Sequence, residues 1–195
     1  MNRRQHPRSA QQGFSMIEVL VSMVILLVGL LGLAGLVIAS QKAEAESFQR
    51  SQAILLAQDM VSRITSNSRV AGCYAITTDT SNGLPWLGTT ASPPPACGLG
   101  SLAAYTAANG DLAAWGDLLL GRTETDGGAK VGAMTGARGC VWFDAASGQY
   151  MVAVAWQGSV PTSAPPATLA CGKNQYGDER LRRVVSLPVL IPNLN

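Results

Sequence analysis

The chain has 195 residues, of which 47% are hydrophobic and only 13% are charged, with a formal net charge of +2. Ordinary globular domains carry about twice this share of charged residues, roughly 25%. These values exclude a highly charged disordered protein and a strongly basic nucleic-acid binder. The length favours one domain, or one domain with an appendage, so the position of the apolar residues decides the architecture.

The apolar residues concentrate near the N-terminus. Residues 19–41 contain no charged side chain. As a helix this stretch would be about 35 Å long, enough for a bilayer core of about 30 Å. A short head with Arg3, Arg4 and Arg8 precedes it. The positive-inside rule therefore predicts that residues 1–13 lie in the cytoplasm and the rest of the chain outside it.

Two simpler interpretations of this stretch are a cleaved secretory signal and a plain membrane anchor. The A-x-A pattern at 43–45 fits a signal-peptidase site, but the apolar run exceeds the roughly 7–15 residues of a signal peptide. A plain anchor explains the length but not Glu18, because an ionisable side chain within an apolar segment is costly and is by default functional.

Residues 13–20, with the sequence GFSMIEVL, resemble the processing site of type IV pilins and pseudopilins. In that family a prepilin peptidase, which is also a methyltransferase, cuts after the glycine and methylates the new N-terminus. The resemblance implies cleavage between Gly13 and Phe14, N-methylation of Phe14, and Glu18 as the fifth mature residue. It also implies that Glu18 pairs with the amine of a neighbouring subunit, which would satisfy two charges that are each costly in an apolar environment.

The sequence LVGLLGLAGL at 27–36 resembles the anchor of PilV-like minor pilins of the type IV pilus. Gly29, Gly32 and Gly35 recur every third residue and form a slowly drifting stripe on a helix. Small residues allow close helix packing in a membrane or a filament core. Shorter phrases beyond the anchor, such as DLAAW at 111–115 and RGCV at 138–141, also resemble this group.

No proline occurs between Pro7 and Pro85, so one helix is predicted from about 15 to 66. Residues 14–40 are expected to form its transmembrane and assembly half, and residues 41–70 an amphipathic half. The amphipathic half has an apolar stripe, predicted to cover a sheet, at Ala45, Phe48, Gln52, Ala53, Leu56, Ala57, Met60 and Ile64.

Residues 71–195 are predicted to form a periplasmic head. Residues 79–100 are expected to be loop and residues 107–115 a short helix after a turn. Strands are predicted at 139–143, 150–156 and 181–187, in an antiparallel sheet of three or four strands. On the middle strand Met151, Ala153 and Ala155 share the face of smaller residues, which we expect to receive the long helix. The fold class is α+β, a type IV pilin fold.

Four cysteines lie beyond the apolar stretch, where the compartment would be oxidising. They allow three connectivities, and nearest-neighbour spacing favours Cys73 with Cys97 and Cys140 with Cys171. Each bond would close a loop of about 25–30 residues, worth about 3 kcal/mol in the chain-entropy model. The sequence has no C-x₂₋₄-C pair, so no zinc site is expected.

No enzymatic activity, cofactor, metal site or small-molecule substrate is predicted. The single histidine, His6, lies in the leader, which leaves no His-based catalysis in the mature chain. Asp144, Asp178 and Glu179 are expected to be solvated loop charges, with calcium ligation as a weak alternative. Arg180, Arg182 and Arg183 form the one basic cluster. This cluster lacks an aromatic stacking platform, so nucleic-acid binding is not expected. We expect the three arginines to face solvent on a strand, near acidic side chains.

The resemblance implies a minor pilin that is processed in the bacterial inner membrane and joins other minor pilins and the major pilin. Its expected roles are priming of pilus assembly, a position at the tip, and support of twitching motility and adhesion. The alternatives are a minor pseudopilin of a type II secretion system and a helix-anchored adhesin or DNA-uptake pilin.

Removal of the leader would change the charge balance. Without Arg3, Arg4 and Arg8, the chain has eleven basic and twelve acidic residues. The positive net charge of the whole chain therefore comes from the leader, where it indicates membrane orientation, and it gives no reason to expect an acidic binding partner.

Overall fold

The computed structural model describes residues 13, 15–91, 96–121, 125–126, 129–130 and 134–191. Phe14 and most of the leader lie outside the described residues. The chain divides into two compact units, at 1–44 and 45–195. One helix, α1 (Met16–Ser66), continues through both, which confirms the single uninterrupted helix predicted from the absence of proline.

The 45–195 unit contains one four-stranded antiparallel sheet in the order β1-β4-β5-β6. These strands are β1 (Leu87–Gly88), β4 (Arg138–Asp144), β5 (Gln149–Gln157) and β6 (Arg182–Val189). A separate pair is formed by β2 (Thr125–Asp126) and β3 (Ala129–Lys130). Two short 3-10 helices, η1 (Ser68–Tyr74) and η2 (Glu179–Leu181), complete the elements with α2 (Leu102–Leu119). The α+β class is confirmed.

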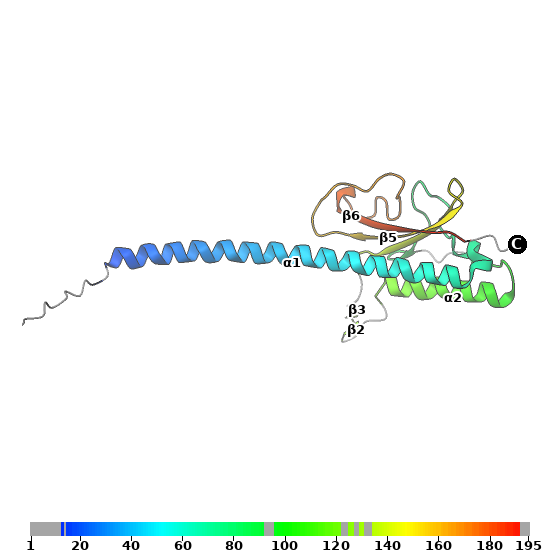
Figure 1. Cartoon of the computed structure of the whole chain (residues 1–195), viewed down its shortest axis with the longest axis horizontal. Coiled ribbons are helices and arrows are strands. Elements are labelled where there is room, and N and C mark those ends of the chain that lie inside the picture. The colour runs from blue at the N-terminus through cyan, green and yellow to red at the C-terminus, as the bar shows by residue number, and fades with distance from the viewer. Residues whose placement is uncertain are drawn as a thin grey trace, which may run out of the picture. The chain divides into compact units, whose positions relative to one another are not determined.

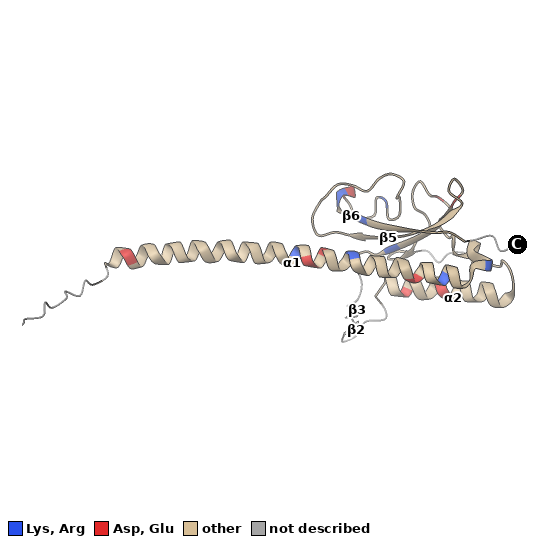
Figure 2. Cartoon of the chain, in the orientation of Figure 1, with Lys and Arg blue, Asp and Glu red and all other residues tan. Residues whose placement is uncertain are grey.

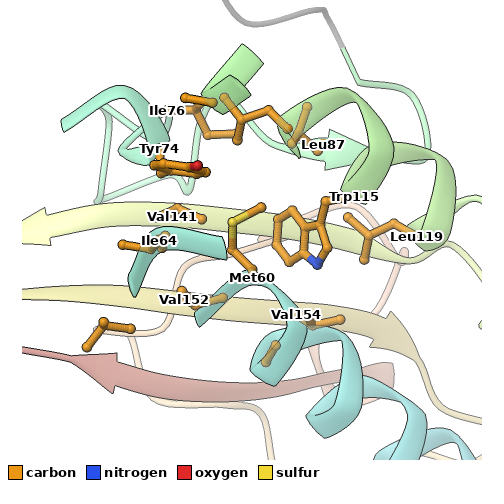
Figure 3. Close-up of a cluster of buried hydrophobic side chains, with 14 of the residues drawn as sticks. Met60, Ile64, Tyr74, Ile76, Leu87, Trp115, Leu119, Val141, Val152 and Val154 are labelled. Atoms are coloured by element: carbon orange, nitrogen blue, oxygen red, sulfur yellow. The ribbon is translucent and has the colours of Figure 1, made fainter. Parts of the chain in front are cut away.

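The C-terminal half of α1 and the helix α2 pack on the same face of this sheet (Figures 1 and 3). The four buried residues of α1 are Ala53, Ala57, Met60 and Ile64, spaced by three and four positions as a helical stripe requires. The predicted stripe extends too far toward the N-terminus, because Ala45 and Phe48 are exposed. Figure 3 shows Met60 and Ile64 against Val141, Val152 and Val154.

The prediction of which sheet face receives α1 is wrong. The face with Val152, Val154 and Trp156 packs on α1, whereas Ala153 and Ala155 belong to a second cluster on the opposite face. The physical reason is complementarity of size. The buried stripe of α1 contains two alanines, so the larger side chains of β5 are needed on this face to fill the space between helix and sheet. The opposite face, with Ala153 and Ala155, leaves room for the Cys140–Cys171 disulfide.

The helix α2 is longer than the predicted 107–115. It begins after Ser101, whose side chain accepts a hydrogen bond from the Ala104 N–H at 3.3 Å, a typical N-cap. Its buried residues are spaced by three and four and continue across Asn109 and Gly110, a pair of residues typical of turns. Apart from Gly116, they are Ala108, Leu112, Trp115 and Leu119. Burial of this apolar face outweighs the local turn preference.

Candidate functional site

The N-terminus of α1 is fixed by Ser15, directly before Met16. The Ser15 carbonyl accepts hydrogen bonds from the Glu18 and Val19 N–H groups at 3.0 and 3.3 Å, and its Oγ accepts one from Ile17 at 3.4 Å. Glu18 therefore lies in the first helical turn, where the helix dipole stabilises a negative charge. Gly13 is exposed and lies three residues before Met16, the first residue of α1, so the predicted cleavage position is close to the start of the helix.

Glu18 is exposed, and within the described residues no ion pair involves it. From Glu18 to Lys42 α1 carries no other charge, as Figure 2 shows. A carboxylate at the edge of such an apolar surface has no partner supplied by the described part of its own chain. Its electrostatic requirement must be met by solvent or by another molecule.

The predicted glycine stripe is also exposed. A Cβ atom added at Gly29, Gly32 or Gly35 would meet no atom within 4 Å outside the helix backbone. These glycines are therefore not needed for packing within the chain, and they cost helix stability of about 1 kcal/mol each relative to alanine. They leave a shallow helix surface that another helix could approach closely.

Of the helices in the described residues, α1 is the one long and apolar enough to cross a membrane. Residues 16–45 are exposed throughout. A soluble protein rarely exposes so large a continuous apolar surface. This surface, together with the N-terminal motif, indicates membrane anchoring.

The four cysteines form two disulfides, Cys73–Cys97 and Cys140–Cys171, with Cα–Cα distances of 5.3 and 5.8 Å. These are the pairs that nearest-neighbour spacing favours. Cys73 lies in η1 and Cys97 precedes α2, so the first bond ties the end of α1 to α2. The second bond is fully buried and ties β4 to the loop before β6.

We expect removal of the buried disulfide to destabilise the head strongly. A Cys140→Ala/Cys171→Ala double variant should lose about 2–5 kcal/mol of unfolding free energy, because the segment from Cys140 to Cys171, which contains β5, is no longer closed in the unfolded chain. Chemical denaturation followed by circular dichroism measures the loss. The matched control is Ser159→Ala, in the loop between β5 and β6, which removes one exposed hydrogen bond to Glu46 and leaves the disulfide intact. Equal stability of the double variant and wild type would contradict this expectation.

A polar network connects α1, η1 and α2. Arg63 pairs with Asp59 at 2.7 Å and with Asp111 at 2.9 Å. The buried Tyr74 hydroxyl donates to Asp111 at 2.6 Å. Burial, followed by the hydrogen bond to Asp111, raises the pKa of Tyr74 to about 12. The network places Asp111, from the DLAAW phrase, where it fixes α2 against the end of α1.

This network makes stability depend on pH in the alkaline range. Because the folded pKa of Tyr74 lies above its ordinary value of 10, its contribution is complete below pH 10 and is lost as pH rises toward 12. Wild type should therefore lose up to about 3 kcal/mol more than Tyr74→Phe over this range. Urea unfolding at a series of pH values measures the difference. Burial also raises the pKa of Tyr150 and Tyr176, but both remain in the variant, so parallel curves would refute the assignment to Tyr74.

The predicted basic cluster is internally neutralised. Arg180 pairs with Asp178 at 2.8 Å, Arg182 with Glu179 at 2.7 Å, and Arg183 with Glu46. The expectation of acidic partners is confirmed, but that of solvent-facing side chains fails for Arg182, which is 2% exposed. Arg182 also donates to the carbonyls of Leu169 and Cys171. Its role is to hold the loop before β6.

The candidate carboxylates do not form a metal site. Asp144 accepts hydrogen bonds from the Ala146 N–H at 3.2 Å and the Ser147 hydroxyl at 2.6 Å, and thus stabilises the β4–β5 turn. The hydrogen bond from Ser147 holds the pKa of Asp144 below its usual value. Among the described residues no three His, Cys, Asp or Glu side chains lie close enough to hold a metal ion.

Sequence reasoning missed Arg138. Its guanidinium carbon lies 5.3 Å from the Trp86 ring centre and 5.0 Å from that of Tyr176. It is 5% exposed and donates to the Gly136 carbonyl at 2.9 Å. A buried cation held between two rings is stabilised by cation–π interactions. No local pattern signals it, because the three side chains come from distant parts of the sequence.

A long apolar N-terminal helix, with a glutamate in its first turn, is joined to a small disulfide-bonded antiparallel sheet, an α+β arrangement consistent with the type IV pilin fold. Residues 8–34 match the family described as the prokaryotic N-terminal methylation motif. This match includes Gly13, Phe14, Glu18 and two of the three stripe glycines, and it ends before the head begins. No curated protein and no solved structure matches the chain.

Proposed function

We propose that this protein is a PilV-like minor pilin that takes part in priming type IV pilus assembly, is located at the tip, and supports twitching motility and adhesion. The observation that carries the proposal is the methylation motif at 8–34, which brings a processing site and an apolar helix together. The LVGLLGLAGL phrase and the two-disulfide head support the minor-pilin assignment over a generic pilin-like protein.

The proposed topology follows from the charge and length of the N-terminal segment. Residues 1–13 are a cytoplasmic leader, 14–40 a transmembrane and assembly helix, 41–70 an amphipathic helix and 71–195 a periplasmic head. Prepilin peptidase removes the leader and methylates Phe14. The protein then waits in the inner membrane as a single-pass subunit and is transferred to the pilus at the cell surface.

Assembly with other pilins uses Glu18 and the glycine stripe. The methylated amine of Phe14 in one subunit pairs with the Glu18 carboxylate of its neighbour, which supplies the partner that Glu18 lacks in the described chain. Gly29, Gly32 and Gly35 let the apolar helices of other minor pilins or the major pilin approach closely. The pairing sets axial register more than it adds net stability.

The two alternatives share the N-terminal motif and are separated by deletion of the gene. Loss of surface pili with intact exoprotein secretion supports the proposed function. The reverse pattern indicates a minor pseudopilin of a type II secretion system. Normal pili with loss of DNA uptake or of surface attachment indicate a helix-anchored DNA-uptake pilin or adhesin. The pairing of Arg180, Arg182 and Arg183 with acidic side chains argues against DNA binding at this cluster.

A further inference from the structure

A groove of about 550 Å³ opens on the sheet face opposite α1. Its floor is formed by Trp142 and Met151, which are paired across β4 and β5. One wall is the turn with Thr80 and Ser81, and the other is the loop that contains Thr168. The volume lies within the roughly 300–1,000 Å³ range of small-ligand sites.

Both walls of the groove are held in place. Asp79 accepts hydrogen bonds from the Ser81 and Asn82 backbone N–H groups, each at 3.1 Å, and the Lys173 ammonium donates to the Ser81 carbonyl at 3.1 Å. The opposite wall is fixed by the Cys140–Cys171 disulfide and by Arg182, which donates to its backbone. A groove with walls fixed in this way is preformed, which reduces the entropic cost of binding.

The groove offers an aromatic platform with an available donor. Trp142 is half-buried, whereas the other three tryptophans are buried. No hydrogen bond in the described residues involves the Trp142 indole N–H, and this atom is not buried. A tryptophan with an accessible ring and a free N–H combines apolar contact with one hydrogen-bond donor.

The other polar side chains that line the groove carry hydroxyl groups and one carboxylate. In the described chain the side-chain hydroxyls of Thr80 and Thr168 form no hydrogen bonds. Asp144 also lines the groove, and the hydrogen bond from the Ser147 hydroxyl holds its pKa below the usual value. Among the residues that the structure describes, no lysine or arginine lines the groove, so a phosphate or another anion would meet only the negative charge of Asp144.

We propose that this groove binds a neutral carbohydrate, with one sugar ring stacked on Trp142 and its hydroxyls bonded to Asp144, Thr80 and Thr168. A pyranose has an apolar C–H face and an edge of groups that both donate and accept. It therefore matches a floor of Trp142 and Met151 and a rim of mixed donors and acceptors. A cationic peptide would pair its charge with Asp144 and could accept from the Trp142 N–H through a backbone carbonyl, so the test below includes such a peptide as a competitor. The proposal does not depend on the chain being a minor pilin.

The test uses the full-length protein in a zwitterionic detergent without a sugar headgroup. Maltotriose, cellotriose and the N-acetylglucosamine trimer are the probes, and saturation-transfer NMR detects binding on the sugar signals. Saturable binding of at least one trisaccharide is expected. Trp142→Ala should weaken it at least about tenfold, the equivalent of roughly 1.4 kcal/mol. Trp142→Phe, which keeps a ring but loses the donor, should weaken it by a smaller factor.

The matched control is Phe143→Ala. Phe143 is the neighbouring β4 residue, is 48% exposed and lies on the opposite sheet face; its removal should leave sugar binding unchanged. Circular dichroism checks that each variant is folded. Absence of binding by all three sugars overturns the proposal, as does equal binding by Trp142→Ala. Binding of trilysine in place of the sugars, abolished by Asp144→Asn, would assign the groove to a cationic peptide and also overturn it.

Discussion

A Gly13→Ala variant should accumulate as an uncleaved precursor that retains residues 1–13. An added methyl group at Gly13 meets no atom within 4 Å among the described residues, so folding and membrane insertion should be unchanged. Leader cleavage is lost because the residue before the scissile bond has to fit the active site of the peptidase. Intact mass and N-terminal sequencing measure the outcome: wild type should begin at methylated Phe14, and the variant at or near Met1.

Gly98→Ala is a suitable control, because Gly98 is also exposed and also has no neighbour within 4 Å of an added Cβ. This variant should be processed as efficiently as wild type. A mature chain that begins at Glu46 would show cleavage at the A-x-A pattern of an ordinary signal peptide and would refute the pilin interpretation. Normal processing of Gly13→Ala would refute the proposed cleavage site.

A Glu18→Ala variant should insert in the membrane at wild-type levels but enter pili at least about tenfold less efficiently. Insertion depends on the uncharged residues 19–41, which the substitution leaves intact. Assembly suffers because the amine of a neighbouring subunit would be buried without a counter-charge, and breaking a buried pair costs about 3–5 kcal/mol. The measurement is the ratio of this protein in sheared pili to that in the membrane fraction.

Glu44→Ala is the matched control for this second prediction. Glu44 is an exposed glutamate on the same helix, just beyond the apolar run, and its loss should not affect incorporation. Wild-type incorporation of Glu18→Ala would refute the pairing of Glu18 with a neighbouring amine.

The sequence predicts α1 and the class of fold well because their signals are local. An uncharged run without proline and a period-3.6 stripe directly report a long helix with one buried face. The hairpin of β4 and β5 is equally local, and the structure extends the predicted strands by only one or two residues. Cleavage after Gly13 and methylation of Phe14 stay predictions from a motif of eight residues.

The errors concern features that depend on packing between distant segments. The face of β5 that receives α1 cannot be read from β5 alone, because it depends on the small size of Ala53 and Ala57 and on the position of Cys171. The buried state of Arg182 depends on carbonyls of the loop before it. The groove beside Trp142 combines residues from the turn at 80–81, from β4, from β5 and from the loop at 167–169, and no spacing rule links the four segments.

The continuity of α1 has a practical consequence for how the head can be produced alone. A truncated protein that begins at Gly72 would lack Ala53, Ala57, Met60 and Ile64, all of which are 0% exposed. The valine-rich sheet face would then be open to water and prone to aggregation. A truncation that begins just before Glu46 removes the exposed apolar half, keeps these four side chains and retains the ion pair of Glu46 with Arg183. The boundary for recombinant work therefore lies inside a helix, near residue 45, and not at the end of that helix.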